Sequence, residues 1–265
     1  MASPHLLYTN VIKTALGALT ASTEETDYDV INLRTDNYAN VWRSTGDAAE
    51  WVKVDLNSAQ TIKACALGNV NLTSAATVTL EGHATDSWGA PSFSEAITAT
   101  SLDGVRRNLY HKLSSSQSYR WWRITFADAA NQDTRIEIGE WSLGEHVEMT
   151  DSFDAAVAIT HNFANTEHVT EQGQSYVYSR DRGAQLDLSW THVQTAARNE
   201  LLALFRAVKG NAIPFFFVYD PDNPAEAYFV RMTTAGIVEQ KIDYGIYSMS
   251  VSLIEQPPGL IVPKD

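Results

Sequence analysis

Apolar and polar residues alternate along much of the first half of the chain. In segments 50–56, 78–80 and 122–126, valine, leucine, isoleucine and aromatic residues fall at every second position. A period of two is that of a β-strand with one face on a core and the other in solvent. Its recurrence at short intervals predicts a β-sandwich, in which Trp122 faces inward and its neighbour Trp121 faces outward.

Two features interrupt this alternation. The polar segment Asn57–Gln60 predicts a short turn between two strands. Further along, the apolar parity changes between Ile138 and Trp141. Because glycine tolerates the backbone of a β-bulge, we predict a bulge at Gly139 or Glu140.

The second half combines strands with one helical pattern. Segments 186–190 and 247–253 alternate apolar and polar residues, which predicts strands with one buried face. Between them, Thr191 and Gln194 form a Thr-x-x-Gln capping box, which predicts a helix that ends near Gly210. An apolar stripe predicts that this helix packs against a sheet. The stripe consists of Ala197, Leu201, Leu204, Phe205 and Val208.

The two halves differ enough to predict two domains. Six of the seven tryptophans precede Gly144, and the one strong helical pattern follows it. A chain of 265 residues is also long for a single domain. We therefore predict a mainly β protein, with a β-sandwich over residues 1–144 and a β-rich domain with one α-helix over 145–265. Residues 1–24 are apolar enough for a strand of the first domain or for an arm to a neighbouring molecule.

Charge and cysteine content narrow the partners. The net charge is −13, and neither half carries a basic stripe that would neutralise phosphates, so we expect no nucleic-acid binding. No apolar run approaches the roughly 20 residues of a membrane span, so we expect no membrane insertion. The single cysteine, Cys65, excludes an intrachain disulfide, and the N-terminus lacks the pattern of a secretory signal. We expect the protein to stay in the compartment in which it is made.

Five segments of the first half together resemble the discoidin family, also called factor V/VIII type C or galactose-binding-like modules. The segments are Asp36–Trp42, Glu50–Leu56, Val78–Trp88, Tyr119–Ile124 and Ile138–Gly144. This resemblance implies a jelly-roll β-sandwich that binds sugars, lipids or proteins through loops at one end. The Asp-Gly pair that usually precedes the tryptophan loop is replaced here by Asp36-Asn37.

The same resemblance implies a structural Ca²⁺ held by the tryptophan loop and the closing strand. Asp36, Asn40 and Glu140 would supply oxygen ligands, together with loop carbonyls. The alternative is that Asp36 and Asn40 are ordinary turn residues whose side chains bind their own backbone. No other cofactor is expected.

A sugar site needs exposed aromatic rings beside hydrogen-bonding side chains. The predicted loops offer such residues, which we take as candidate ligand-binding residues. They are Tyr28, Arg34, Tyr38, Tyr110 and His111, with Trp88 and Arg107 nearby. The resemblance places Trp88 inside the sandwich. Trp121, which faces outward, is expected to be covered by a loop, by the other domain or by a partner.

Four segments of the second half resemble minor and distal tail proteins of bacteriophages. The segments are Leu186–Trp190, Asn199–Phe205, Pro214–Asp220 and Tyr247–Glu255. This resemblance implies a homo-oligomeric ring, for which a hexamer is one candidate, that contacts the tail tube and hub. It also implies assembly in the host cytoplasm and a location in the tail of the virion. Closure into a ring would use up exposed strand edges.

No motif indicates catalysis. The chain lacks a Gly-x-Ser-x-Gly elbow, a His-Glu-x-x-His pair, a phosphate-binding loop and a cysteine cluster. We therefore predict a non-enzymatic structural protein of the phage tail tip or baseplate that displays a carbohydrate-binding-like module toward host-surface glycans. The alternatives are a stand-alone carbohydrate-binding module or receptor-binding accessory, and a glycan hydrolase whose paired carboxylates leave no motif.

Overall fold

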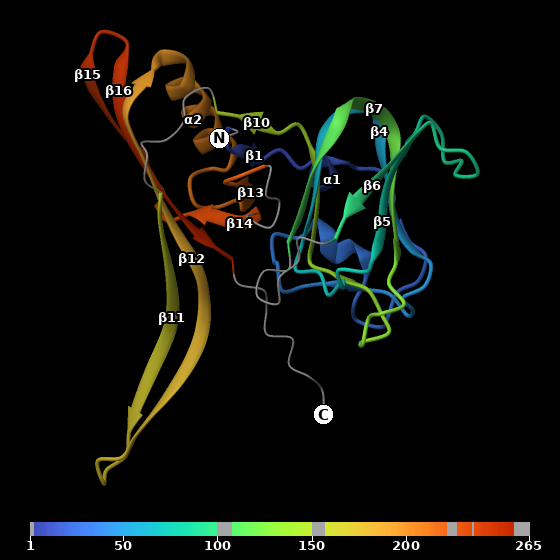
Figure 1. Cartoon of the computed structure of the whole chain (residues 1–265), viewed down its shortest axis with the longest axis horizontal. Helices are drawn as coiled ribbons and strands as arrows, with labels where there is room; N and C mark the ends of the chain where they lie inside the picture. The colour runs from blue at the N-terminus through green and yellow to red at the C-terminus, as the bar shows by residue number, and fades with distance from the viewer. Residues whose placement is uncertain (1–2, 100–107, 150–156, 222–226, 235, 257–265) are drawn as a thin grey trace. The chain divides into compact units, whose positions relative to one another are not determined.

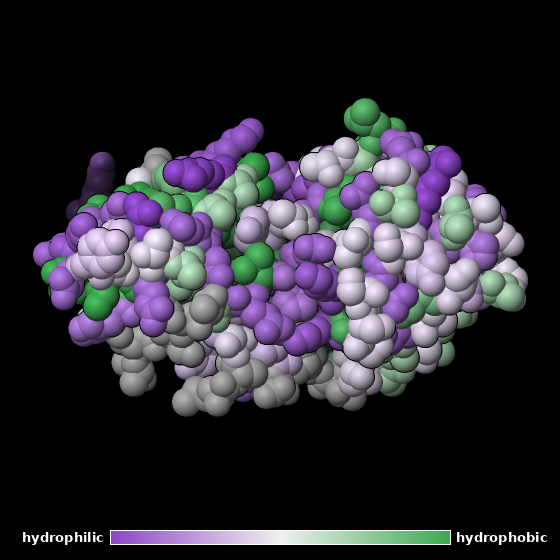
Figure 2. All heavy atoms as spheres, turned by 90° about the horizontal axis from the view of Figure 1, so that it is seen from above, coloured by the Kyte–Doolittle hydropathy of each residue, from purple (hydrophilic) through white to green (hydrophobic). Residues whose placement is uncertain are grey.

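The computed structural model describes residues 3–99, 108–149, 157–221, 227–234 and 236–256. Strands make up 53% of the structure and helices 10%, which confirms the predicted mainly β class. Among the described residues, no helix is long and apolar enough to cross a membrane. On the face seen in Figure 2, hydrophilic residues predominate and apolar residues lie scattered among them, as the acidic composition leads one to expect.

The described residues divide into two compact units. The first contains 3–148 together with 215–228, and the second contains 149–214 and 229–256. The break at 148 lies close to the boundary that the sequence predicted at 144. Residues 215–228, however, belong to the first unit, although the sequence assigned the whole of 145–265 to one domain.

The first unit is built mainly from antiparallel strands. Its strands are β1 (His5–Leu7), β2 (Leu19–Ala21), β3 (Trp42–Arg43), β4 (Glu50–Gly68), β5 (Thr77–His83), β6 (Phe93–Thr98), β7 (Leu109–Ala127), β8 (Glu137–Ile138), β9 (Glu140–Gly144), β10 (Val147–Glu148) and β13 (Phe215–Val218). Its helical turns are α1 (Val11–Thr14) and the 3₁₀ helix η1 (Val30–Arg34). The main sheet has the order β2-β4-β7-β5-β6, and β9 adds to β4.

Two long strands, β4 and β7, pair along most of their length and lie side by side in Figure 1. The predicted turn at Asn57–Gln60 does not separate two strands. Instead β4 continues for 19 residues, and its register against β7 shifts between Asp55 and Gln60. Asn57, with φ of 64°, absorbs the irregularity. The bend lets the second part of β4 pair with β9 while the first part pairs with β2.

The apolar parity of these strands places the core as the sequence predicts. Trp122 is completely buried and Trp121 is half-buried on the opposite face, which confirms their predicted directions. Trp42 and Trp141 are also fully buried in the same core. Cys65 is buried within β4, and burial raises the pKa of its thiol to about 12. It therefore acts as a packing residue.

The change of parity near Gly139 has a different cause from the predicted bulge. The chain leaves one strand and starts another: β8 pairs with β3, whereas β9 pairs with β4. Gly139 lies at the crossing and donates its N–H to the carbonyl of Gly68 at 2.9 Å. A Cβ atom there would lie 2.5 Å from the carbonyl oxygen of Tyr38, so the close approach requires glycine.

Residues near the N-terminus belong to the first unit. Strand β1 lies between β10 and β13, and β2 pairs with β4. In α1, the side chain of Asn10 caps the first turn by accepting from the N–H of Ile12, which is fully buried. Of the two alternatives left open for this segment, the structure shows the folded one.

The second unit contains a sheet and one helix. Its elements are β11 (Ala158–Val169), β12 (Ser175–Gln194), α2 (Thr195–Ala207), β14 (Ala227–Met232), which begins in the first unit, β15 (Val238–Asp243) and β16 (Ile246–Glu255). Strand β16 pairs with β12, with β14 and with β15. The predicted alternation is confirmed, because Leu186, Leu188 and Trp190 are buried and pair with Leu253, Val251 and Met249.

Helix α2 starts later than the capping box predicts. Thr191 and Gln194 belong to β12, and Gln194 precedes the helix without a side-chain cap. These residues stay in the strand and do not start the helix, because Val193 and Gln194 still pair with β16. The predicted stripe is otherwise correct: its members are buried except for Phe205, which is half-buried.

Strands β11 and β12 form a long two-stranded ribbon that projects away from helix α2 (Figure 1). Near its end several apolar residues are solvent-exposed. They are Val169, Tyr176, Val177 and Tyr178, with exposures from 48% to 65%. A ribbon of two strands has no second layer to cover such residues.

Candidate functional site

The structure does not assemble the predicted loop site. Tyr38 is buried, its hydroxyl bonds Asn108, and it accepts from the N–H of Asn69 at 2.8 Å. Tyr110 is a buried residue of β7, and its hydroxyl lies 2.8 Å from Nδ1 of His5. Neither ring is available to stack on a ligand at the surface, so both are corrected to structural residues.

The other three predicted residues lie apart from one another in different roles. Tyr28 is half-buried beneath the guanidinium of Arg43, 3.7 Å from its ring centre. Arg34 donates to the carbonyl of Gly17 at 2.7 Å. His111 is on β7, not in a loop, and its Nε2 lies 2.7 Å from the carboxylate of Glu95. Arg107 lies outside the described residues.

The predicted calcium ligands converge only in part. Asp36 and Glu140 do meet, but they meet on the ammonium of Lys13, at 3.0 Å and 2.9 Å. Asn40 is exposed, and its backbone N–H bonds the Asn37 carbonyl in a turn. Calcium requires six or more oxygen ligands, and here a cationic side chain occupies the space between the two carboxylates. The residues do not fit a calcium ion.

Glu140 is the buried member of this cluster. Its second oxygen accepts hydrogen bonds from Asn10 and Ser142, each at 2.9 Å. Burial raises the pKa of Glu140 to about 7, against the opposing effects of Lys13 and the two hydrogen-bond donors. The cluster ties α1 to β9 through polar contacts.

The outward face of the main sheet carries two half-buried tryptophans, Trp51 and Trp121. In register, Lys53 of β4 lies opposite Arg123 of β7, and Arg123 lies opposite Glu81 of β5. One step along the sheet, Asp55, Trp121 and His83 form the next row. Since side chains alternate between faces, these residues lie on the face opposite the core. Asp55 is the buried member, at 6% exposure, and pairs with Arg120 at 2.7 Å.

Loop 84–90 folds over this face and adds Trp88. Asp86 accepts from Lys53 Nζ at 2.7 Å and from Trp88 Nε1 at 2.5 Å. The Trp88 ring lies beneath Arg123, whose guanidinium carbon is 4.5 Å from the ring centre. Burial acts to raise the pKa of Asp86, but the hydrogen bonds from Lys53 and Trp88 hold this pKa below its ordinary value. Trp88 is therefore half-buried outside the sheet, not in the interior as the resemblance implied.

Three half-buried tryptophans thus lie among paired charges, and we call this surface the tryptophan face. It comprises Trp51, Trp88 and Trp121 with Lys53, Glu81, Asp86 and Arg123. The ammonium of Lys53 lies 5.2 Å from the Trp51 ring and 5.8 Å from the Trp121 ring. These cation–π contacts keep the aromatic surfaces spread along the sheet.

A hollow of about 320 Å³ opens beside this face. Trp51 and Arg123 border it, with Thr77 and Thr125 on its polar side. An aromatic wall beside hydroxyl and guanidinium groups can stack on one side of a ring-shaped ligand and hydrogen-bond its substituents. The arrangement suits an uncharged polar ligand, because the local charges already pair with one another.

Sequence reasoning found only part of this surface. The parity of the strand placed Trp121 outward, but the loops and not the sheet face were expected to carry the site. Predicting this surface requires the register that sets Lys53 opposite Arg123. The register between two strands that are far apart in sequence cannot be deduced from their local patterns. The outward parity of Trp51 between two buried residues was the signal that could have been used.

No protein-family model matches this chain, and no curated protein matches it. Solved structures similar to about half of it include several carbohydrate-binding modules. One is a chitosan-binding module of a Paenibacillus chitosanase/glucanase, with 19% identity over 51% of this chain and 96% of the module, at a TM-score of 0.38. Another is a fucose-binding module of Streptococcus pneumoniae, with 13% identity over 52% and 98% of the two chains, at 0.40. A third is the family 32 module of Clostridium perfringens NanJ in complex with galactose, with 11% identity over 52% and 98%, at 0.41.

At TM-scores near 0.4, these similarities carry no argument about the function of this chain. None of the three is a phage tail protein, so the resemblance of the second half stays a prediction.

Proposed function

We propose that this protein is a non-catalytic carbohydrate-binding protein and that the tryptophan face is its binding surface. The observation that carries the proposal is the gathering of Trp51, Trp88 and Trp121 on one outward sheet face, among hydrogen-bonding charged groups and beside a hollow. Aromatic rings that gather on one exposed face, beside polar groups, are typical of a surface that binds a ligand or a partner.

The chemistry of the face favours neutral sugars. Arg123 pairs with Glu81 at 2.6 Å and Lys53 pairs with Asp86 at 2.7 Å, so the surface offers donors and acceptors without a net local charge. The hydroxyls of a pyranose need both kinds of group, while its apolar face stacks on an indole ring. Acidic glycans would meet a protein with a net charge of −13 and are disfavoured.

The test is binding of the full chain to an array of neutral and acidic glycans. We expect Trp51→Ala to weaken binding at least tenfold, because loss of one stacked ring removes about 1.5 kcal/mol or more. Tyr244→Ala is the matched control, since this tyrosine is 92% exposed in the second unit. Binding that survives Trp51→Ala combined with Trp121→Ala would remove the face from consideration, and absence of binding to any glycan would remove the function.

We further propose that the chain assembles into the ring at the tail tip of a bacteriophage, in contact with other tail proteins. The supporting observation is the exposed apolar surface of the second unit. Tyr176 and Tyr178 project from one side of the β11–β12 ribbon, and Val238 of β15 is 77% exposed. Exposed apolar residues on strands are typical of surfaces that pair with another subunit.

Mass measurement of the full chain in solution tests this assembly. We expect oligomers that dissociate in the double variant Tyr176→Ser, Tyr178→Ser, whereas Tyr244→Ser leaves them intact. A wild-type chain that stays monomeric at high concentration contradicts the ring. Assembly without sugar binding, or the reverse, separates the two proposals.

A further inference from the structure

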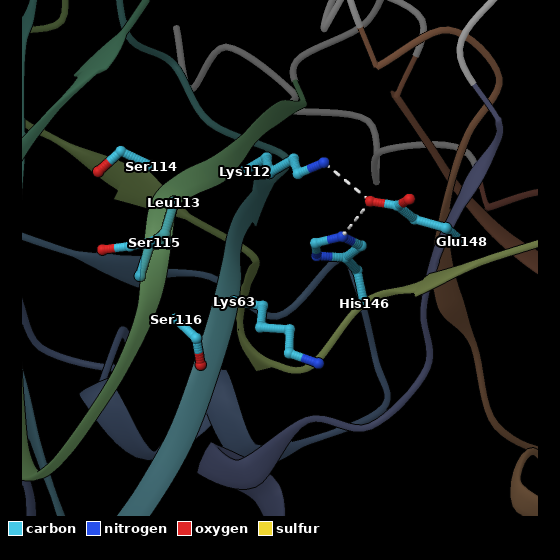
Figure 3. Close-up of a pocket in the computed structure, with 8 residues that line it drawn as sticks. All are labelled: Lys63, Lys112, Leu113, Ser114, Ser115, Ser116, His146 and Glu148. Carbon is cyan, nitrogen blue, oxygen red and sulfur yellow. Dashed lines mark hydrogen bonds and ion pairs between the residues drawn. The ribbon is translucent and has the colours of Figure 1, made fainter.

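Two histidines and a glutamate meet where the N-terminal strand joins the end of the first unit. His5 of β1 lies directly opposite Glu148 of β10, and His146 precedes that strand. The two imidazole rings are stacked, with centres 4.3 Å apart. Figure 3 shows His146 and Glu148 directed toward each other at one side of a hollow.

Two of the three distances between ligand atoms in this cluster match those around a tetrahedral metal ion. Glu148 Oε1 lies 3.4 Å from His5 Nε2 and 3.2 Å from His146 Nε2. A zinc ion with bonds of about 2.0–2.1 Å separates its ligand atoms by about 3.3–3.4 Å in a regular tetrahedron. All three ligand atoms lie within 4.8 Å of one another. Rotation of one imidazole would bring its nitrogen into bonding distance of an ion held by the other two residues.

Both histidines are buried, and a neighbouring side chain holds one of them in place. His5 is 2% exposed and His146 is 9% exposed. The Nδ1 of His5 lies 2.8 Å from the hydroxyl of Tyr110, an outer partner that fixes the ring and leaves Nε2 for a metal.

One cation competes for this position. Lys112 Nζ lies 2.8 Å from Glu148 Oε1, as Figure 3 shows. Its side chain is 51% exposed, so it can turn into solvent when a metal takes its place. The adjoining hollow, of about 310 Å³, gives water access to a fourth coordination position.

We propose that His5, His146 and Glu148 form a binding site for one zinc ion, with water as the fourth ligand. Two imidazoles and one carboxylate suit zinc, whereas calcium and magnesium prefer oxygen ligands alone. The ion joins β1 to β10. This site is separate from the tryptophan face and does not depend on the proposed sugar binding.

Zinc binding to the full chain is measured by titration calorimetry and by competition with a chromogenic chelator at pH 7.5. We expect one zinc ion per chain and a rise in Tm on its addition. Glu148→Gln should weaken binding by tenfold or more, because it replaces a charged ligand at a half-exposed position where the fold tolerates it. Lys112→Met should tighten binding, since it removes the competing ammonium.

His111→Gln is the matched control, because this histidine is on the same strand as Lys112 but pairs with Glu95. It should bind zinc as the wild type does. Co²⁺ provides a second readout, since a tetrahedral site gives intense visible absorption that Glu148→Gln abolishes. A wild type that binds no zinc overturns the proposal, as does equal binding by wild type, Glu148→Gln and His146→Gln.

Discussion

At the scale of single residues, distance along the sequence does not decide the surroundings of a side chain. Trp121 and Trp122 are adjacent, yet one lies beside Lys53 at the surface and the other is fully buried. Asp36 and Glu140 are far apart in sequence, yet both bond the same ammonium of Lys13. The first contrast follows from strand parity and the second from the fold.

The tryptophan pair gives a direct test of parity. We expect Trp122→Ala to lower the free energy of unfolding by roughly 3–5 kcal/mol, because it leaves a large cavity in the core. Trp121→Ala should cost far less, since its ring already contacts solvent. Chemical denaturation of both variants measures the difference, and equal losses would show that the inward and outward assignments are wrong.

Glu140 makes stability depend on pH. Burial raises its pKa from the ordinary 4.5 to about 7 in the folded state, so its contribution to stability is full below pH 4.5 and is lost as pH rises through 7. The difference corresponds to about 3 kcal/mol. We expect Glu140→Gln to remove this fall when unfolding is measured at pH 4.5 and pH 8.

The Tm of the zinc-free wild type should also be the same with and without excess calcium, because Lys13 occupies the space between the carboxylates. A pH profile of Glu140→Gln that parallels the wild type would contradict the burial of this carboxylate. A rise in Tm with calcium would contradict the lysine as the cation of this cluster.

At the scale of elements, close approaches decide where strands begin and end. Strands β8 and β9 are separated at Gly139, where the chain passes against the backbone of Tyr38. Likewise, α2 begins only where pairing between β12 and β16 stops. In both places the local sequence signal was correct in kind, but contacts with a distant strand set the boundary.

Gly139→Ala tests the crossing between β8 and β9. The new Cβ would lie 2.5 Å from a backbone oxygen and 2.9 Å from the Cβ of Asn69, so neither neighbour can move cheaply. We expect a loss of about 1–3 kcal/mol, measured by thermal or chemical unfolding. Gly89→Ala is the control, because nothing lies within 4 Å of its added Cβ. Equal stability of the two variants would argue against the close approach.

At the scale of the whole molecule, the first unit is completed by a distant segment. Strand β13 pairs with β1 through Phe216, Phe217 and Val218, more than 200 residues along the chain. Phe216 is fully buried, and its ring lies 3.1 Å from the position of a Cβ on Gly68. The unit is therefore discontinuous in sequence, and a cut near residue 148 removes part of its core.

We expect the fragment 1–148 to be less stable than the same unit in the full chain, by roughly 3 kcal/mol or more, the cost of one large core truncation. Joining residues 215–228 to Glu148 through a flexible linker should restore most of the loss. Hydrogen exchange of the β1 amides provides the measurement. A fragment 1–148 whose β1 is as protected as in the full chain would contradict the role of β13.

The sequence by itself determined which residues face the core and which face solvent. It set the inward parity of Trp122, the alternation of β12 and β16 and the buried stripe of α2, because side-chain direction follows from the local period of the backbone. Only the tertiary structure decided which outward residues meet. The register of β4 against β7 assembled the tryptophan face, and the pairing of β1 with β10 brought His5 to Glu148. Register depends on many weak contacts between segments far apart in the chain, and no local pattern encodes that sum.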